Sequence, residues 1–170
     1  MTFNFIVTVL SVALTTSTVF AAGNHAGGHA DSDAIGKPGK ATNAKRTVKL
    51  EMLDTMRFNP QSITVKQGET IKFVVKNSGK VKHEMVLGTE KELKEHAEVM
   101  KKNPEMEHDD ANQITVQPGK SGEIIWQFTK MGKVNFACLQ PGHYDAGMAG
   151  TVTVNKAKGH THAHESAHNH

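Results

Sequence analysis

The single cysteine of the chain has a histidine and a methionine close to it in the sequence. Cys138 is followed after five residues by His143 and after another five by Met148. A thiolate, an imidazole and a thioether are ligands of soft and borderline metal ions. The alternative is that three unrelated core residues happen to be neighbours. The choice depends on whether the chain supplies a further ligand and a fold that brings the residues together.

A histidine far upstream occupies a position where an apolar residue would be expected. His83 lies in the alternating stretch of residues 81–87, whose other inward positions are apolar. Cys138 continues the alternation of Val134 and Phe136, so it is expected on the core-facing side of its own strand. Buried imidazole nitrogens are costly unless they have a polar partner or a metal ion. His83 is therefore the candidate for a fourth ligand.

The segment after the cysteine is rich in residues that allow tight turns. A Pro-Gly pair at residues 141–142 lets His143 fold back toward Cys138, and glycines on either side of Met148 let the backbone bend again. One thiolate, two imidazoles and one thioether form a soft donor set. Such a set suits copper, with two His and one Cys in a trigonal arrangement and a long axial Met.

Two other chemistries use the same residue types. Zinc also binds Cys and His, but thioether sulfur is a poor zinc ligand and structural zinc sites usually carry more thiolates. A nucleophilic Cys–His pair would leave Met148 without a role. The residues therefore predict a metal site made of His83, Cys138, His143 and Met148, with copper as the first candidate and zinc as the alternative.

Short alternating runs separated by turn residues occupy most of the chain between residues 45 and 155. The expected strands lie around residues 48–52, 63–65, 71–75, 81–87, 114–116, 124–128, 134–138 and 152–154. Gly, Pro or Asn follows most of these runs. Short strands at this spacing predict an all-β fold, an antiparallel β-sandwich or barrel.

One segment has the pattern of a helix. Thr89 and Glu92 form a capping box, and apolar residues recur at helical spacing until Asn103 and Pro104 end the pattern. We therefore expect one short helical insertion between the strands around residues 81–87 and 114–116.

The helical insertion carries a second group of metal-binding residue types. His96 and Met100 lie one helical turn apart, and Met106 and His108 follow. These residues could form a second copper site. The interpretation that we favour from sequence is that Met100 packs against the sandwich and both histidines face water.

The first 21 residues are predicted to be a signal peptide. A mostly apolar run from residue 5 to 14 is followed by Ser, Thr and small residues. The run is too short to span a bilayer, and no second apolar run follows it. We therefore expect a periplasmic protein without a membrane span.

The two ends of the remaining chain are expected to lack fixed structure. Residues 22–45 are predicted to be a flexible arm that contains His25 and His29, and residues 156–170 a disordered tail with five histidines. Neutral imidazoles in such segments could hold additional copper weakly. A domain over residues 46–155 lies between them.

Composition excludes some classes of partner and function. The net charge is only +3, the lysines are scattered, and there is one Trp and one Tyr, so no nucleic-acid surface is expected. A chain of 170 residues suits one domain with tails, and we expect a monomer. An unpaired cysteine is unusual in an oxidising compartment, and a bound metal would protect it.

The predicted ligands resemble those of the cupredoxins, the family of type 1 copper proteins. Residues 138–148 are similar to the C-x4-H-x4-M ligand loop of auracyanin- and rusticyanin-like members, and His83 to the first ligand, on the strand before a helical insertion. Residues 56–68 resemble the N-terminal strand pair. The resemblance covers residues 46–155 and implies a Greek-key β-sandwich with one type 1 copper, in which His143 would lie near the surface as the electron port.

Two positions depart from the pattern that is common in this family. Glu84 follows the first histidine where many members have an Asn that ties the two ligand loops together, and Leu139 follows the cysteine where many have Ser or Thr. The sequence around His83 and the histidine-rich ends are more similar to cupredoxins associated with bacterial copper tolerance.

The resemblance leads to two functional hypotheses. The first is an exported protein that serves copper tolerance in the cell envelope by binding and redox-cycling copper. The alternative is a diffusible single-electron carrier with a redox partner protein, which an apolar patch formed around His143 by Tyr144, Ala146, Met148 and Ala149 would favour. We expect no enzyme, because copper oxidases and nitrite reductases need further histidines between domains.

Overall fold

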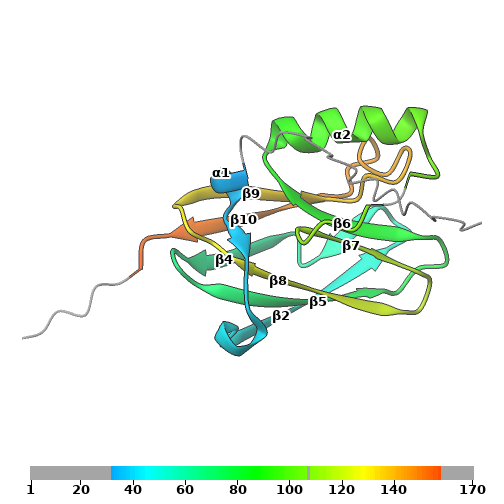
Figure 1. Cartoon of the computed structure of the whole chain (residues 1–170). Helices are drawn as coiled ribbons and strands as arrows, with labels where there is room; N and C mark the ends of the chain where they lie inside the picture. The colour runs from blue at the N-terminus through cyan, green and yellow to red at the C-terminus, as the bar shows by residue number, and fades with distance from the viewer. Residues whose placement is uncertain (1–31, 107, 158–170) are drawn as a thin grey trace, which may run out of the picture.

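Two β-sheets packed face to face make up most of the structure, a computed structural model that describes residues 32–106 and 108–157 (Figure 1). The first sheet contains, in spatial order, β1 (Lys37–Pro38), β8 (Ser121–Gln127), β5 (Thr70–Asn77), β2 (Arg46–Leu53) and β3 (Arg57–Asn59). The second contains β4 (Ser62–Lys66), β10 (Ala149–Asn155), β9 (Gly132–Ala137), β6 (His83–Gly88) and β7 (Gln113–Val116). The helices are α1 (Ser32–Ile35), the 3-10 helix η1 (Ala41–Asn43) and α2 (Glu90–Lys102).

The space between the sheets is filled by apolar side chains that alternate along the strands. In β5 the side chains of Ile71, Phe73 and Val75 are buried. Phe136 of β9 packs edge-on against Phe58 of the opposite sheet, with ring centroids 5.0 Å apart. Alternate burial is what a sandwich requires, because each sheet hides one face against the other. The predicted β-sandwich with one helical insertion is confirmed.

The strands of the sandwich do not all run antiparallel. β2 pairs with β5 and β4 pairs with β10 in parallel, and the other described pairs are antiparallel. The reason is that the chain crosses from the first sheet to the second between β3 and β4 and returns with β5. Alternating hydrophobicity shows which residues face the core but not the direction of the neighbouring strand, so the sequence pattern could not reveal this.

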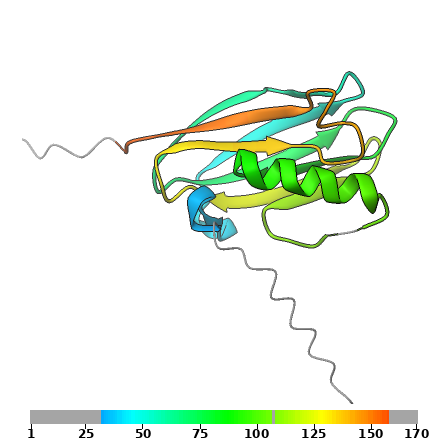
Figure 2. The same cartoon turned by 90° about the horizontal axis from the view of Figure 1, so that it is seen from above.

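Strand β6 is buried on both faces. All of its residues, His83–Gly88, have buried side chains or backbone, whereas Val81, which we expected to begin this strand, precedes it and is exposed. Helix α2 covers the outer face, where Val86 packs with Leu93 and Leu139 (Figure 2). The first predicted ligand therefore begins a strand that has no solvent-facing side.

Helix α2 has the bounds that its sequence predicts. The Thr89 hydroxyl accepts a hydrogen bond from the Glu92 amide at 3.2 Å, and the Glu92 carboxylate accepts one from the Thr89 amide at 2.8 Å. This capping box satisfies amide groups that have no partner within the helix. The apolar side of the helix, with Leu93, Ala97 and Met100, is buried against β6 and β9.

The segment before the sandwich is part of the folded structure from Ser32 onward. Strand β1 pairs with the end of β8, Ile35 is buried, and the indole N–H of Trp126 donates to the Ile35 carbonyl at 2.8 Å. At Gly36, where φ is +112°, a Cβ would lie 2.1 Å from the Gln127 carbonyl oxygen. The prediction of a flexible arm over residues 22–45 therefore does not hold from Ser32 onward.

The remaining terminal predictions concern residues outside the described part of the chain. These are the signal peptide over residues 1–21, the histidines His25 and His29, and the histidines of the tail, which lie beyond residue 157. Within residues 32–106 and 108–157, no helix combines the length and apolar character that crossing a membrane requires.

Candidate metal centre

The predicted ligands come together at one end of the second sheet. His83 begins β6, Cys138 follows the last residue of β9, and Met148 directly precedes β10. Because β9 pairs antiparallel with both β6 and β10, the start of β6, the end of β9 and the start of β10 share one end of the sheet. His143 lies in the turn between Cys138 and Met148, so three neighbouring strand ends and one loop supply the site.

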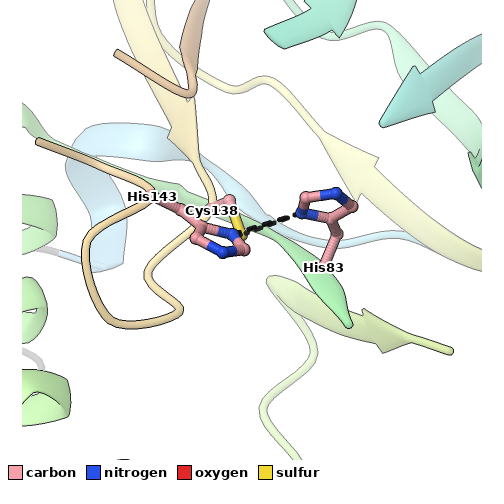
Figure 3. A group of neighbouring side chains, drawn as sticks. All are labelled: His83, Cys138 and His143. Atoms are coloured by element: carbon pink, nitrogen blue, oxygen red, sulfur yellow. Dashed lines mark hydrogen bonds between the residues drawn. The ribbon is translucent and has the colours of Figure 1, made fainter. Parts of the chain in front are cut away.

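Three donor atoms form a compact triangle (Figure 3). The Nδ1 atom of His143 is 3.2 Å from the Cys138 Sγ and 3.2 Å from the Nδ1 of His83, and the Cys138 Sγ is 3.9 Å from the latter atom. Metal–nitrogen and metal–sulfur bonds of about 2.0–2.3 Å place neighbouring ligand atoms about 3–4 Å apart. The triangle therefore fits one metal ion bound by all three donors.

The fourth predicted ligand is fixed to the other two members of the loop through its backbone. The Met148 carbonyl accepts a hydrogen bond from the Cys138 amide at 3.0 Å, and the Met148 amide donates to the His143 carbonyl at 3.0 Å. Its side chain is fully buried and belongs to the same apolar cluster as Cys138. The backbone of Met148 is thus held beside Cys138 and His143, and its side chain lies in the protein interior.

Glu84 joins the two segments that carry the donors. Its carboxylate accepts hydrogen bonds from the Leu139 amide at 2.8 Å and the Gln140 side-chain amide at 3.1 Å, and its own amide donates to the Cys138 Sγ at 3.4 Å. Glu84 is only 6% exposed. Glu84 therefore links the two ligand loops, which is the role that Asn has in many members of the family.

Asp54, in the turn between β2 and β3, orients His83. Its carboxylate lies 3.1 Å from the Nε2 of His83 and accepts a hydrogen bond from the Lys80 amide at 2.7 Å. These contacts lower the pKa of Asp54, the Lys80 amide most strongly and the His83 ring less. Because an ionised carboxylate can only accept, the Nε2 of His83 is the donor and its Nδ1 keeps a lone pair for a metal.

Burial favours the uncharged forms of Cys138 and His143. Removal from water raises the pKa of the Cys138 thiol to about 12. Burial, and next the neighbouring His83, lower the pKa of His143. At neutral pH the thiol is therefore protonated and the His143 ring neutral. One thiol and two imidazoles beside a thioether form the donor set of a type 1 copper centre, and a cation there would stabilise the buried thiolate.

Sequence reasoning proposed the group of His83, Cys138 and His143 that the structure brings together, but missed the residues that support it. Asp54 was not considered because nothing in the local sequence of a turn indicates which distant side chain its carboxylate will meet. Glu84 offered a usable signal, since a carboxylate inside an otherwise apolar strand needs several donors.

Comparison with known proteins gives consistent similarities. The model of the family described as "Copper binding proteins, plastocyanin/azurin family" matches residues 44–155. The copper-resistant cuproprotein CopI of Rubrivivax gelatinosus is 54% identical over 132 residues, covering 76% of this chain and 80% of the relative. CopI of Pseudomonas aeruginosa is 38% identical over 154 residues, covering 74% and 84%.

Two solved structures are similar in fold. Dithionite-reduced auracyanin from Roseiflexus castenholzii has a TM-score of 0.55 at 25% identity, covering 65% of this chain and 98% of that one. Auracyanin A from Chloroflexus aurantiacus, described as a "blue" copper protein, has a TM-score of 0.54 at 24% identity, covering 64% and 98%.

Removal of the Asp54 carboxylate should weaken metal binding. In Asp54→Ala the His83 ring loses the acceptor that orients it, and loss of such a support typically lowers metal affinity by about 10- to 100-fold. Competition titrations with a copper chelator measure the change. Glu123→Ala, which removes an exposed carboxylate from β8, is the matched control. Equal affinities in both variants would contradict the orienting role.

Copper uptake by the metal-free protein should release one proton from Cys138. Between about pH 8 and 10 the thiol is protonated, since its folded-state pKa is about 12, whereas the lowered pKa of His143 leaves that ring without a proton to lose. The apparent affinity should therefore rise about tenfold per pH unit in this range. Calorimetry in buffers of different ionisation enthalpy counts the proton, and Cys138→Ser serves as the control. A pH-independent affinity in the unchanged protein would refute the assignment.

Proposed function

The chain belongs to the plastocyanin/azurin family of copper-binding proteins, and on that premise we propose that it binds one copper ion in the cell envelope and serves copper tolerance. The observation that carries this proposal is the buried group of His83, Cys138 and His143, whose donor atoms all lie within 4.8 Å of one another. The similarity to copper-resistant cuproproteins supports the physiological role.

In this proposal His83, Cys138, His143 and Met148 would hold the copper ion. A bound copper ion would supply a one-electron couple between Cu(I) and Cu(II). Asp54 holds one imidazole in place, Glu84 fixes the distance between β6 and the ligand loop, and the buried surroundings exclude water. The protein therefore contributes a preformed set of donors that need not rearrange when the charge of the ion changes.

The surroundings of the ligand loop favour a copper-holding role over electron exchange with a docked redox partner. Of the residues expected to form an apolar patch around His143, Met148 is buried, and Tyr144 and Ala149 pack against the cluster beneath α2. Ala146 is exposed, but charged groups flank it: Arg57 donates to its carbonyl at 2.8 Å, and the neighbouring Asp145 pairs with Lys101 at 2.8 Å.

Two further parts of the proposal concern location and class. We propose export to the periplasm by the segment over residues 1–21, because its apolar run and small residues have the pattern of a signal peptide. We also propose that the protein is a monomeric copper-binding protein and not an enzyme. Copper redox cycling is the only chemistry that we propose for it. The single-electron carrier is the second candidate, favoured by the partial exposure of His143.

The ligand assignment predicts a spectroscopic signature. The copper-loaded protein should show an intense thiolate-to-copper absorption band in the visible range, and Cys138→Ser should abolish it. Met148→Leu should keep the band but shift its energy, because it removes a weak sulfur ligand and nearly conserves volume. Met131→Leu, at a methionine that is 58% exposed, should change nothing. A band that persists in Cys138→Ser would disprove the thiolate assignment.

The physiological role predicts a growth phenotype. Deletion of the gene should lower the copper concentration that the cells tolerate and leave respiration unchanged. Reintroducing the unchanged gene should restore tolerance, whereas the Cys138→Ser gene should not, because the buried site cannot form without the thiolate. Growth curves across copper concentrations and oxygen-consumption rates measure the two properties. Unchanged tolerance with impaired respiration would favour the electron carrier.

A further inference from the structure

Two histidines outside the metal centre face each other across the outer side of α2. The Nε2 atoms of His96, on α2, and His108, in the segment after the helix, are 3.0 Å apart. Their ring centroids are 4.5 Å apart and the ring planes are inclined by 72°. Both residues are partly exposed. Both histidines are thus partly exposed to water, as expected, but the prediction missed that they contact each other.

The backbone fixes the position of the returning segment at both of its ends. Asn103 caps α2, its amide donating to the Val99 carbonyl at 3.0 Å. At the other end Asn112 is bonded to Leu87 of β6 twice, through the Leu87 amide at 2.9 Å and through its own side-chain amide to the Leu87 carbonyl at 2.7 Å. From residue 108 the chain runs back beside α2 (Figure 2). The meeting of His96 and His108 thus follows from how the segment is held.

The separation of the two nitrogens is that of two ligands on one metal ion. Two metal–nitrogen bonds of about 2.0–2.1 Å at tetrahedral or square-planar angles place the nitrogens about 3 Å apart. The two histidines of the metal centre, whose Nδ1 atoms are 3.2 Å apart, show nearly the same separation. Without a metal, one imidazole N–H donates to the lone pair of the other ring, and a metal ion would take the place of that proton.

The electrostatic surroundings favour neutral, metal-binding rings. Burial, and next the proximity of His108, lower the pKa of His96, so that this ring is neutral at neutral pH and offers its lone pair. The charge of Asp110 has the opposite effect on the pKa of His96, which places a carboxylate in its neighbourhood. A cation at the pair would therefore find a nearby negative charge.

Met100 is not available to make the pair a soft site. Met100, one helical turn from His96, is 1% exposed and packs with Leu93 and Ala97 in the cluster beneath the helix. It therefore cannot serve as the partner that the sequence spacing suggested. Two imidazoles and water form a borderline-to-hard donor set that prefers Cu(II) or Zn(II) over Cu(I).

We propose that His96 and His108 form a second metal site, which takes Cu(II) with water as the remaining ligands. This site shares no residue with the group around Cys138 and is open to solvent, so it would exchange its ion readily. Among divalent first-row ions Cu(II) binds nitrogen and oxygen donors most tightly. The protein would then hold a second copper ion in a different chemical environment on the same domain.

Nuclear magnetic resonance of the imidazole nitrogens tests the site on the full chain. The metal centre is first loaded with diamagnetic Cu(I), and Zn(II) is then titrated in as a redox-inert stand-in that any site suited to Cu(II) imidazole binding would also accept. The ring signals of His96 and His108 are followed separately from those of the tail. His96→Asn and His108→Asn are compared with His164→Asn, which removes one tail imidazole as a matched control.

The proposal expects the His96 and His108 signals to shift together along one saturation curve. Each single variant should weaken binding at the remaining histidine on the order of 100-fold, because the second imidazole acts at high effective concentration, and His164→Asn should leave the curve unchanged. Retention of the thiolate-to-copper band in each variant loaded with Cu(II) shows that the fold is intact. Unchanged Zn(II) affinity of His108 in His96→Asn, or saturation of the tail with no shift at the pair, would overturn the proposal.

Discussion

The buried carboxylate of Glu84 sets the distance on which the metal centre depends. It lies next to His83 in β6 and accepts hydrogen bonds from the Leu139 amide and the Gln140 side chain, on the loop that carries Cys138. A carboxylate hidden from water is costly unless it is fully bonded, so the loop has a strong preference for this one position. Two donors that are 55 residues apart in the chain are thereby held as a pair before any metal arrives.

Helix α2 also holds the ligand loop in place, from the outer side of the second sheet. It covers β6 and β9, packs over Leu139 and Tyr144 of the ligand loop, and pairs Lys101 with Asp145. The loop is therefore held on its inner side by hydrogen bonds and on its outer side by apolar packing. A site clamped in this way changes little between oxidation states. The same cover leaves little apolar surface for docking, which is why the geometry agrees better with copper holding than with electron delivery.

Much of this arrangement could be predicted from the sequence, and there are physical reasons why the rest could not. The spacing of Cys138, His143 and Met148, the alternation around His83 and the capping box of α2 are local patterns that can be recognised without knowledge of the fold. The roles of Asp54 and the meeting of His96 with His108 depend on where two turns lie in space, and turn sequences do not encode their distant neighbours. The order of residues 32–45 was missed because it rests on one pairing with β8 and one indole hydrogen bond, not on periodicity.

The segment of residues 32–45 protects one edge of the first sheet. β1 covers the end of β8, and with the bond from the Gly39 amide to the Ile125 carbonyl it pairs backbone groups that would otherwise lie bare at a sheet border. Unpaired strands of this kind recruit strands from other molecules. A fragment trimmed to the family match at residue 44 would keep every proposed copper ligand but would expose the unpaired edge of β8. The segment before residue 44 therefore protects against self-association, although it supplies none of the proposed ligands.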